Sequence, residues 1–344
     1  VFVVCGSVSS WIEKNIISST GFLGRIVLKI TLGELSLSEC NDLMQRMGFH
    51  RSLIERFQLL SVTGGIPWYL ELIHPKYSAE ENIKRLCFEK DAILVDEFKY
   101  IFHDLFGRRG DICKRIVEYL AKGPAEYADI VAGLHYHNSG SLSDYLDDLL
   151  ISGFISRDYT WSLKNGRDSR LSQFRLSDNY IRFYLKYILP RLSRIHKNQF
   201  TQFTLALLTN WDSVAGLQFE NLVLNNRKTI QALLGLKEVE ILADNPYFQN
   251  KTTKQHGCQI DYLIQTRYNT LFVCEIKFSK KEIDFSVVQE VKDKISKLTL
   301  PKGYACLPVL IYVNGVNEAI EAAGYFFRMI DFSNLLYHWT LDKP

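Results

Sequence analysis

The sequence predicts a multidomain α/β protein, and three observations support that prediction. The chain has 344 residues, the length of two or three ordinary domains. Its middle third has apolar residues at helical spacing, and its last third has two runs that alternate like half-buried strands. Hydrophobic residues make up 47% of the chain and charged residues 23%, which is the balance of a folded globular protein.

Composition limits the class of protein further. The formal net charge of +3 neither supports nor excludes binding to nucleic acid, because a folded protein can gather its basic residues on one face. No apolar run approaches the ~18 residues of a membrane span, so we expect no membrane association. We also expect no secretory signal, because the first residues are a short apolar run and not a basic region followed by a long apolar core. The seven cysteines are scattered without a Cys-x-x-Cys pair, which predicts reduced thiols in the cytoplasm rather than disulfides or zinc sites.

The first predicted elements are a strand, a polar turn and a second strand. Residues 1–5 form a continuous apolar run, typical of a strand in a parallel sheet that is covered on both faces. The turn that follows contains Ser7 and leads into a helix. Arg25 precedes a second predicted strand over residues 26–30, and a helix is expected over residues 38–47.

The order of these segments resembles archaeal-type ATPases of the AAA+ and STAND classes. The turn with Ser7 is similar to their sensor-1 strand, Arg25 to an arginine finger, and Thr-Gly-Gly-Ile-Pro-Trp-Tyr-Leu at residues 63–70 to the Gly-x-Pro motif of the helical lid. The alternatives are a helix N-cap for Ser7 and a surface cation for Arg25. The resemblance implies ATP as the cofactor, contacted by Ser7 and Arg25, and a homo-oligomer formed through the ATPase domain.

One motif of that family does not occur. No Gly-x-x-x-x-Gly-Lys-Ser/Thr loop is found in the sequence, although this loop supplies most of the phosphate contacts in such enzymes. We therefore expect the chain to lack the N-terminal half of an ATPase core, and to bind ATP tightly only together with that half.

The middle of the chain predicts three helices and a hairpin. Helical stripes cover residues 112–120, 126–132 and 141–151, and a strand follows from residue 153. A polar loop then leads to a returning strand over residues 173–177. This order is the pattern of a winged helix-turn-helix.

The charges of the third helix indicate how the winged helix is used. Asp144, Asp147 and Asp148 lie on it without any Lys or Arg, whereas contact with DNA phosphates requires positive charge. Basic residues of the hairpin could still contact the phosphate backbone of a nucleic acid. We expect a packing module between domains rather than a sequence reader. An aromatic helix over residues 177–190 and a basic linker over residues 191–198 are expected next.

The last third contains the most informative pattern, Asp261 followed by Glu275-Ile276-Lys277. A strand is predicted over residues 259–264 and another over residues 271–278, with a turn between them. Side chains alternate along a strand, so Glu275 and Lys277 project to one side, and a hairpin brings Asp261 to the same side. Two carboxylates and an ammonium group suit a divalent metal and an attacking water for phosphodiester cleavage.

This pattern resembles the PD-(D/E)xK restriction-endonuclease-like fold. The resemblance implies that Asp261 and Glu275 bind Mg²⁺ and that Lys277 orients or activates the water. It also implies that Glu220 reaches the site from a preceding helix over residues 216–223, and Gln289 from a helix that follows the hairpin. The alternative is a solvated Glu/Lys pair at a sheet edge.

Together these patterns predict four consecutive parts. They are a truncated AAA+ core over residues 1–31, a helical lid over 32–106, a winged helix-turn-helix over 107–190 and an α/β restriction-endonuclease-like domain over 191–344. The function expected from them is metal-dependent cleavage or binding of DNA by part of an ATP-binding protein. The alternatives are a non-catalytic, ATPase-linked scaffold or regulatory module, and an inactive remnant.

Overall fold

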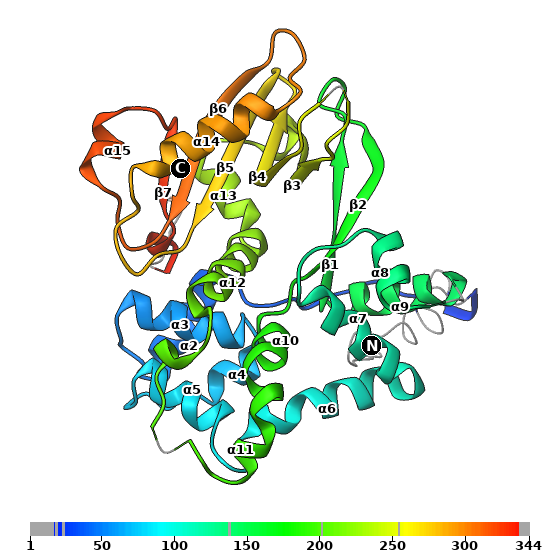
Figure 1. Ribbon diagram of the computed structural model, residues 1–344, viewed down its shortest axis with the longest axis vertical. Helices are drawn as coiled ribbons and strands as arrows, with labels where there is room; N and C mark the ends of the chain where they lie inside the picture. The colour runs from blue at the N-terminus through cyan, green and yellow to red at the C-terminus, as the bar shows by residue number, and fades with distance from the viewer. Residues whose placement is uncertain are drawn as a thin grey trace. The chain divides into compact units, whose positions relative to one another are not determined.

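The computed structural model shows an α/β protein with helices, a two-stranded sheet and a five-stranded mixed sheet (Figure 1). The structure describes residues 17, 20–22, 25–136, 139–200, 202–253 and 255–336. The strand predicted over residues 1–5 and the predicted nucleotide contact Ser7 lie outside the described residues.

The chain divides into two compact units, and each combines segments that are far apart in the sequence. The unit called here the helical unit comprises Val1–Glu34, Lys84–Arg157 and Gln173–Gln202. The other, called the sheet unit, comprises Leu35–Ile83, Asp158–Ser172 and Phe203–Pro344. The sequence predicts consecutive domains instead, because periodicity reports local structure and not which distant segments pack together.

Helices joined by short connections make up most of the Lys84–Arg157 segment of the helical unit. They are α6 (Ile93–Phe106), η3 (Gly107–Arg109), α7 (Gly110–Leu120), α8 (Tyr127–Gly133) and α9 (Ser139–Ile151). The last three are the helices predicted for the winged helix-turn-helix, apart from their terminal residues. A β-carbon on Gly110 would lie 2.7 Å from the carbonyl oxygen of Phe102, so glycine allows α7 to begin directly against α6.

A two-stranded sheet follows α9, at the place predicted for the wing. Its strands are β1 (Ile155–Trp161) and β2 (Asp168–Leu176). Ala125, between α7 and α8, forms an antiparallel bridge with Phe174 through backbone hydrogen bonds of 3.0 and 2.8 Å. The hairpin is thereby joined to the helices that precede it.

One of the three aspartates on α9 points into the helical unit. Asp148 is buried and its carboxylate pairs with the guanidinium of Arg109 at 2.5 Å, while Asp144 and Asp147 are exposed. The acidic character of α9 is therefore partly used in holding the unit together.

Aromatic rings form the centre of the helical unit. Phe98 of α6 stacks on Tyr184 with ring centroids 4.3 Å apart and an angle of 5° between the rings. Phe102 contacts Phe106 and Phe154 at 5.4 and 5.8 Å between centroids. Such contacts add to the energy of apolar burial.

The prediction of a helix that ends at Pro190 and continues as a basic linker is wrong. Helical turns instead continue as α10 (Asn179–Phe183), η4 (Tyr184–Ile188), η5 (Leu189–Arg191) and α11 (Leu192–His196). Proline disrupts regular α-helical hydrogen bonding, and here η4 is a π-helix and η5 a 3₁₀ turn, which accommodate it. Ile195 is fully buried, so α11 packs into the unit.

The strand predicted over residues 26–30 is also wrong. Within the described part of the chain no β-bridge joins this segment, and the side chains of Val27 and Leu28 are 94% and 72% exposed. Apolar β-branched residues favour extended backbone, but a strand also needs a partner along its edge. Arg25 is exposed in a turn before this segment, after the 3₁₀ turn η2 (Thr20–Phe22).

Helices from the front and the middle of the chain belong to the sheet unit. They are α2 (Leu37–Arg46), α3 (Leu53–Thr63), α4 (Pro67–Glu71), η6 (Leu205–Leu207), α12 (Trp211–Asn225) and α13 (Arg227–Leu233), and α5 (Ala79–Cys87) crosses the boundary between the units. Gly64 ends α3 with φ at 59°, and Pro67 begins α4. The Gly-x-Pro segment is thus a sharp turn between two helices.

Aromatic contacts join the early and late segments of the sheet unit. Phe219 of α12 lies 5.8 Å from Phe57 of α3, 5.2 Å from Phe332 and 5.5 Å from Phe278, measured between ring centroids. Phe278 follows directly after the last residue of strand β5, so α12 is packed beside the end of that strand.

The five-stranded sheet has the order β3–β4–β5–β6–β7. The strands are β3 (Ile241–Gln249), β4 (Cys258–Thr266), β5 (Thr270–Lys277), β6 (Ala305–Tyr312) and β7 (Arg328–Asp331). The first three are antiparallel and the last three parallel. The predicted hairpin is therefore present as β4 and β5. The shorter elements around the sheet are η7 (Glu238–Glu240), α15 (Glu318–Ala322) and η8 (Phe332–Leu336).

Two helices cover opposite faces of the sheet. Helix α14 (Ser286–Lys297) connects β5 to β6 and lies across one face (Figure 1). On the other face Gln231 of α13 donates a 2.8 Å hydrogen bond to the hydroxyl of Tyr262, which in turn donates 2.9 Å to Asp244. Because Tyr262 follows Asp261 in β4, the two side chains point to opposite faces, and Asp261 faces α14.

The tip of the β1–β2 hairpin packs within the sheet unit. Trp161 and Leu163 are buried in one apolar cluster with Ile260 and Leu271. The fully buried Gln265 accepts a 2.6 Å hydrogen bond from the Trp161 indole and donates 2.8 Å to the carbonyl oxygen of Leu163. The tip is therefore fixed on the sheet.

Across the residues that the structure describes, no helix combines the length and apolar character that crossing a membrane requires.

Candidate active site

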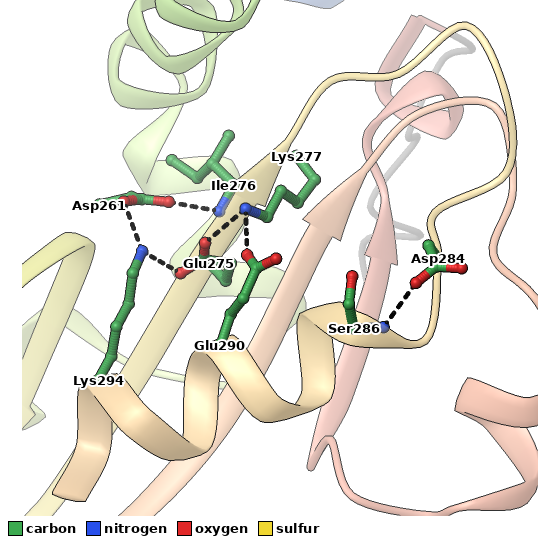
Figure 2. A network of polar contacts seen from close by, with 8 residues as sticks. All are labelled: Asp261, Glu275, Ile276, Lys277, Asp284, Ser286, Glu290 and Lys294. Atoms are coloured by element: carbon green, nitrogen blue, oxygen red, sulfur yellow. Dashed lines mark hydrogen bonds and ion pairs between the residues drawn. The ribbon is translucent and has the colours of Figure 1, made fainter.

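Five charged side chains gather where β4 and β5 meet helix α14. Tyr262 pairs with Cys274 in the antiparallel register, and Asp261 and Glu275 are the next residues along the two strands. Lys277 follows two residues later in β5, on the same side of the strand. The remaining two, Glu290 and Lys294, come from α14 (Figure 2).

A single ammonium group joins the two carboxylates of the hairpin. The Nζ atom of Lys294 lies 3.2 Å from Oδ1 of Asp261 and 2.5 Å from Oε2 of Glu275. The two oxygens can therefore be no farther apart than these distances taken together, and one ammonium group bridges them. The side chain of Glu275 is 3% exposed and that of Asp261 15% exposed, so this contact is largely shielded from water.

A second ammonium group occupies the other side of Glu275. Nζ of Lys277 lies 3.0 Å from Oε1 of Glu275 and 2.8 Å from Oε2 of Glu290. Each oxygen of Glu275 thus faces a different lysine (Figure 2).

The orientation of Asp261 is fixed by the backbone of the neighbouring strand. The N–H of Ile276 donates a 2.9 Å hydrogen bond to Oδ2 of Asp261. This bond holds the carboxylate so that its other oxygen, Oδ1, faces Lys294 and the centre of the cluster (Figure 2). Ile276 itself is buried, which keeps this part of β5 in place.

Burial and charge act in opposite directions on the ionisation of the cluster. Burial raises the pKa of the Glu275 carboxyl and the charge of Asp261 raises it further, while Lys294 and Lys277 lower it. Burial lowers the pKa of Lys277, but the hydrogen bond to Glu290 and the charge of Glu275 outweigh that effect and raise it above the ordinary value. The pKa of Lys294 is likewise lowered by burial but raised more by Asp261 and Glu275. Both lysines therefore carry a positive charge at neutral pH.

The apolar stripe of α14 determines which of its side chains reach the site. Val287 and Val291 are buried beneath the helix. Glu290 and Lys294 lie one turn apart beside this stripe, on the side toward the hairpin. The backbone at the end of the helix is tied to the sheet, because the thiol of Cys258 donates to the carbonyl oxygen of Lys294 at 3.3 Å.

The structure does not bring every predicted residue into the cluster. Gln289 is exposed, and its amide donates a 2.7 Å hydrogen bond to Asp293 on the same helix. The prediction that Gln289 lines the site is therefore wrong. The next residue, Glu290, faces the site instead. Glu220 is half-buried on α12, the helix that packs beside the end of β5. Arg25 belongs to the helical unit.

Two members of the cluster, Glu290 and Lys294, are absent from the residues expected from the sequence. The signal that could have found them is the heptad-like spacing of α14, in which Val287 and Val291 define the buried stripe and positions 290 and 294 lie next to it.

The donor set fits a hard divalent cation. Mg²⁺ is usually bound in proteins through one or two carboxylates, with waters and substrate phosphates completing its coordination. Asp261 and Glu275 direct one oxygen each toward a single position that Nζ of Lys294 takes. Among the residues described, no group of three or more His, Cys, Asp and Glu side chains is arranged to hold a metal. Asp261 and Glu275 are thus the two carboxylates that converge on one position, and water and phosphate would complete the coordination.

The fold and the site define an α/β protein with a carboxylate–lysine cluster on a mixed sheet. No protein-family model matches the chain. It is 30% identical over 154 residues to "Uncharacterized protein MJECL04" of Methanocaldococcus jannaschii; this match covers 42% of the chain and 32% of the relative, so the chain spans about a third of the relative's length. Protein VC1899 from Vibrio cholerae is a solved structure with 13% identity and a TM-score of 0.29 over 72% of this chain and 55% of its own.

Proposed function

We propose that the sheet unit is a nuclease-like module that binds a divalent cation, Mg²⁺, and acts on DNA by cleaving a phosphodiester bond. The observation that carries the proposal is the convergence of Asp261 Oδ1 and Glu275 Oε2 on one cationic atom. A lysine two residues after the glutamate, with its ammonium 3.0 Å from Glu275, completes the set of groups that the PD-(D/E)xK pattern requires.

Each residue has a distinct role in this proposal. Asp261 and Glu275 hold the cation, which when bound supplies Lewis acidity to the phosphate and to a coordinated water. The bond from Ile276 to Asp261 keeps one oxygen of that carboxylate directed at the cation position. Lys277 stays protonated and stabilises the negative charge that develops on the phosphoryl oxygens, or orients the attacking water by hydrogen bonding.

The substrate class follows from the same groups. A phosphodiester carries negative charge at the position where the cluster presents a cation and an ammonium. The hairpin tip adds exposed basic residues to the sheet unit, namely Lys164, Arg167 and Arg170. Positive charge on a surface favours binding to a polyanion such as DNA in a salt-dependent way.

The proposal extends to the front of the chain. We propose a cytoplasmic ATP-binding protein of the AAA+ or STAND kind, assembled as a homo-oligomer through its ATPase domain. The order of the front motifs supports this extension, and the turn at Gly64 and Pro67 agrees with a lid motif. The segment over residues 26–30 counts against it, because it is exposed and forms no strand.

A second candidate function is a non-catalytic scaffold or regulatory module. The position of Lys294 favours it, because an internal ammonium group already satisfies both carboxylates. In that case the cluster stabilises the sheet unit and any DNA binding depends on surface charge alone.

Cleavage and cation binding measured on the same variants separate the two functions. We expect the whole chain to nick duplex or single-stranded DNA with Mg²⁺ or Mn²⁺. Lys277→Ala should abolish cleavage and leave Mn²⁺ binding intact in a calorimetric titration, while Asp261→Ala should lose both. Lys281→Ala is the matched control, because Lys281 is exposed four residues further along.

Two results would contradict the nuclease proposal. One is the absence of metal-dependent cleavage on every DNA substrate. The other is cleavage by Lys277→Ala at the rate of the unaltered protein, which would point to a contaminating enzyme or to a different site.

A further inference from the structure

The geometry points to Lys294 as a resident cation: its ammonium group and a divalent metal ion compete for the same position between Asp261 and Glu275. This inference rests on the proposed function only for the identity of the metal. It goes beyond that function because it makes cation binding an exchange, in which Lys294 must leave before a metal can enter.

The contact geometry leaves one position for a cation between the two carboxylates. Lys294 reaches one oxygen of each carboxylate, at 3.2 Å for Asp261 and 2.5 Å for Glu275. Those oxygens are the ones that remain available, since Oδ2 of Asp261 accepts from Ile276 and Oε1 of Glu275 faces Lys277. An ammonium and a metal ion bridging the same oxygens cannot be present together.

The net charge of the cluster depends on which cation lies between the two carboxylates. The carboxylates of Asp261, Glu275 and Glu290 face the two ammonium groups of Lys277 and Lys294, which leaves one excess negative charge. A divalent ion in place of Lys294 makes the positive and negative charges equal. Removing both cations would leave the buried Glu275 beside Asp261 with only Lys277 as a partner, and unpaired buried charge is strongly unfavourable.

The exchange needs no movement of the backbone of α14. The backbone at the end of α14 is held by Cys258 on the Lys294 carbonyl and by Gln249, whose amide donates 2.7 Å to the carbonyl oxygen of Lys297. The Lys294 side chain is 28% exposed, and its ammonium group is carried on a flexible stem of four carbons. Its ammonium can turn into water while the helix stays where it is.

The consequence is that the metal concentration needed to fill the site is raised by the Lys294 ion pair. Without metal, Lys294 keeps the two carboxylates together and the site pre-formed. With metal, the protein gives up this ion pair, so the measured affinity is lower than the two carboxylates alone would provide.

The test is Mn²⁺ binding to the whole chain, measured by calorimetry, in four proteins. Lys294→Met keeps the length of the side chain and removes its charge, and we expect it to bind Mn²⁺ at least about tenfold more tightly than the unaltered protein. Lys294→Arg keeps a cation and should bind no more tightly than the unaltered protein. Lys297→Met, an exposed lysine of the same helix, is the control for charge and should also bind as the unaltered protein does.

Thermal unfolding of the same proteins gives a readout without activity. Lys294→Met should melt at a lower temperature than Lys297→Met in metal-free buffer, and Mn²⁺ should raise its melting temperature more than that of the unaltered protein. Equal Mn²⁺ affinity in Lys294→Met and the unaltered protein, or no binding by either, would overturn the inference.

A measurement on the unaltered protein covers the case in which Lys294→Met does not fold. Labelling with an amine-reactive acetylating reagent, followed by mass spectrometry of the peptide that contains Lys294, should increase several-fold when Mn²⁺ is added, while labelling of Lys297 stays constant. Labelling of Lys294 that is unchanged or reduced by Mn²⁺ would overturn the inference.

The results also distinguish this inference from the proposed function. Tighter metal binding by Lys294→Met with no DNA cleavage supports the exchange and removes the nuclease proposal. Metal-dependent cleavage with equal metal affinity in both proteins supports the nuclease proposal and removes the exchange.

Discussion

The indole Nε1 of Trp161 donates a 2.6 Å hydrogen bond to Oε1 of Gln265, and this bond fastens the tip of the β1–β2 hairpin to strand β4. Gln265 is fully buried and also donates to the Leu163 carbonyl oxygen and, at 3.1 Å, to the Tyr304 hydroxyl. One amide group thus connects three segments of the sheet unit.

Replacing this amide should loosen the hairpin tip. Gln265→Leu leaves the Trp161 N–H and the Leu163 carbonyl without their partner, which costs about 1–3 kcal/mol for each buried group. We expect a lower urea midpoint and faster proteolysis between residues 158 and 172. Gln259→Leu makes the same change at an exposed position of β4 and should alter neither. Unchanged proteolysis in Gln265→Leu would show that apolar packing alone holds the tip.

Two glycine substitutions should have opposite effects on stability. A β-carbon at Gly110 would lie 2.7 Å from the Phe102 carbonyl oxygen, so Gly110→Ala should separate α6 from α7 and cost about 1–3 kcal/mol. Gly216 lies inside α12 with no atom within 4 Å of that position, so Gly216→Ala should stabilise by up to about 1 kcal/mol. Urea denaturation of both variants checks the pair, and a Gly110→Ala variant as stable as the unaltered protein would contradict the packing described for α6 and α7.

The buried Asp178 should make stability depend on pH. Burial raises its pKa to about 7, with a further contribution from Glu34, while hydrogen bonds from Ile181 and Tyr180 and the charge of Arg182 act against this. In the unfolded chain the pKa is about 3.9, so between these values the folded state binds more protons. Stability from this group is therefore complete below about pH 4 and is lost as the pH rises toward 7.

The variant Asp178→Asn tests that dependence. Asparagine keeps the oxygen that accepts 2.7 Å from the Ile181 N–H at the start of α10, but it does not ionise. Urea midpoints at pH 5 and pH 8 should differ less for Asp178→Asn than for the unaltered protein. The exposed Asp168→Asn serves as the control. A drop in stability with pH that persists in Asp178→Asn would assign it to another group.

Nucleotide binding by this chain should be weak. The sequence has no Gly-x-x-x-x-Gly-Lys-Ser/Thr loop, whose amides and lysine provide most of the phosphate contacts. We expect no saturable binding of ATP with Mg²⁺ below millimolar concentration in isothermal titration. A micromolar dissociation constant would contradict this expectation.

Local patterns in the sequence were sufficient for the hairpin and for three helices of the helical unit. Residues 259–264 and 271–278 alternate, and β4 and β5 occupy these positions because alternation is itself the property of a half-buried strand. The register of a short hairpin then brings Asp261 and Glu275 to neighbouring places, where both contact Lys294. Residues 26–30 have the same apolar character, but strand formation there depended on a partner that local sequence does not specify.

The members of the cluster on α14 illustrate the remaining gap. Lys294 is one of several lysines on an amphipathic helix, and nothing in its immediate sequence separates it from Lys297. What distinguishes it is its contact with Asp261 and Glu275, which it reaches from a helix whose Val287 and Val291 are buried in one cluster with Leu310 of β6. Gln289 was expected at the site from the resemblance to the PD-(D/E)xK fold, and a rotation of one residue about the helix axis exchanges it for Glu290.

The segments of the two units alternate along the chain, and this limits how recombination can separate the units. The sheet unit includes Leu35–Ile83 from the front of the chain, and Phe57 from that segment packs against Phe219. A single breakpoint in the gene therefore cannot transfer the charged cluster with its complete supporting core. Recombination would have to preserve the order of all six segments, so the two units should be gained, lost and duplicated together rather than shuffled as separate cassettes.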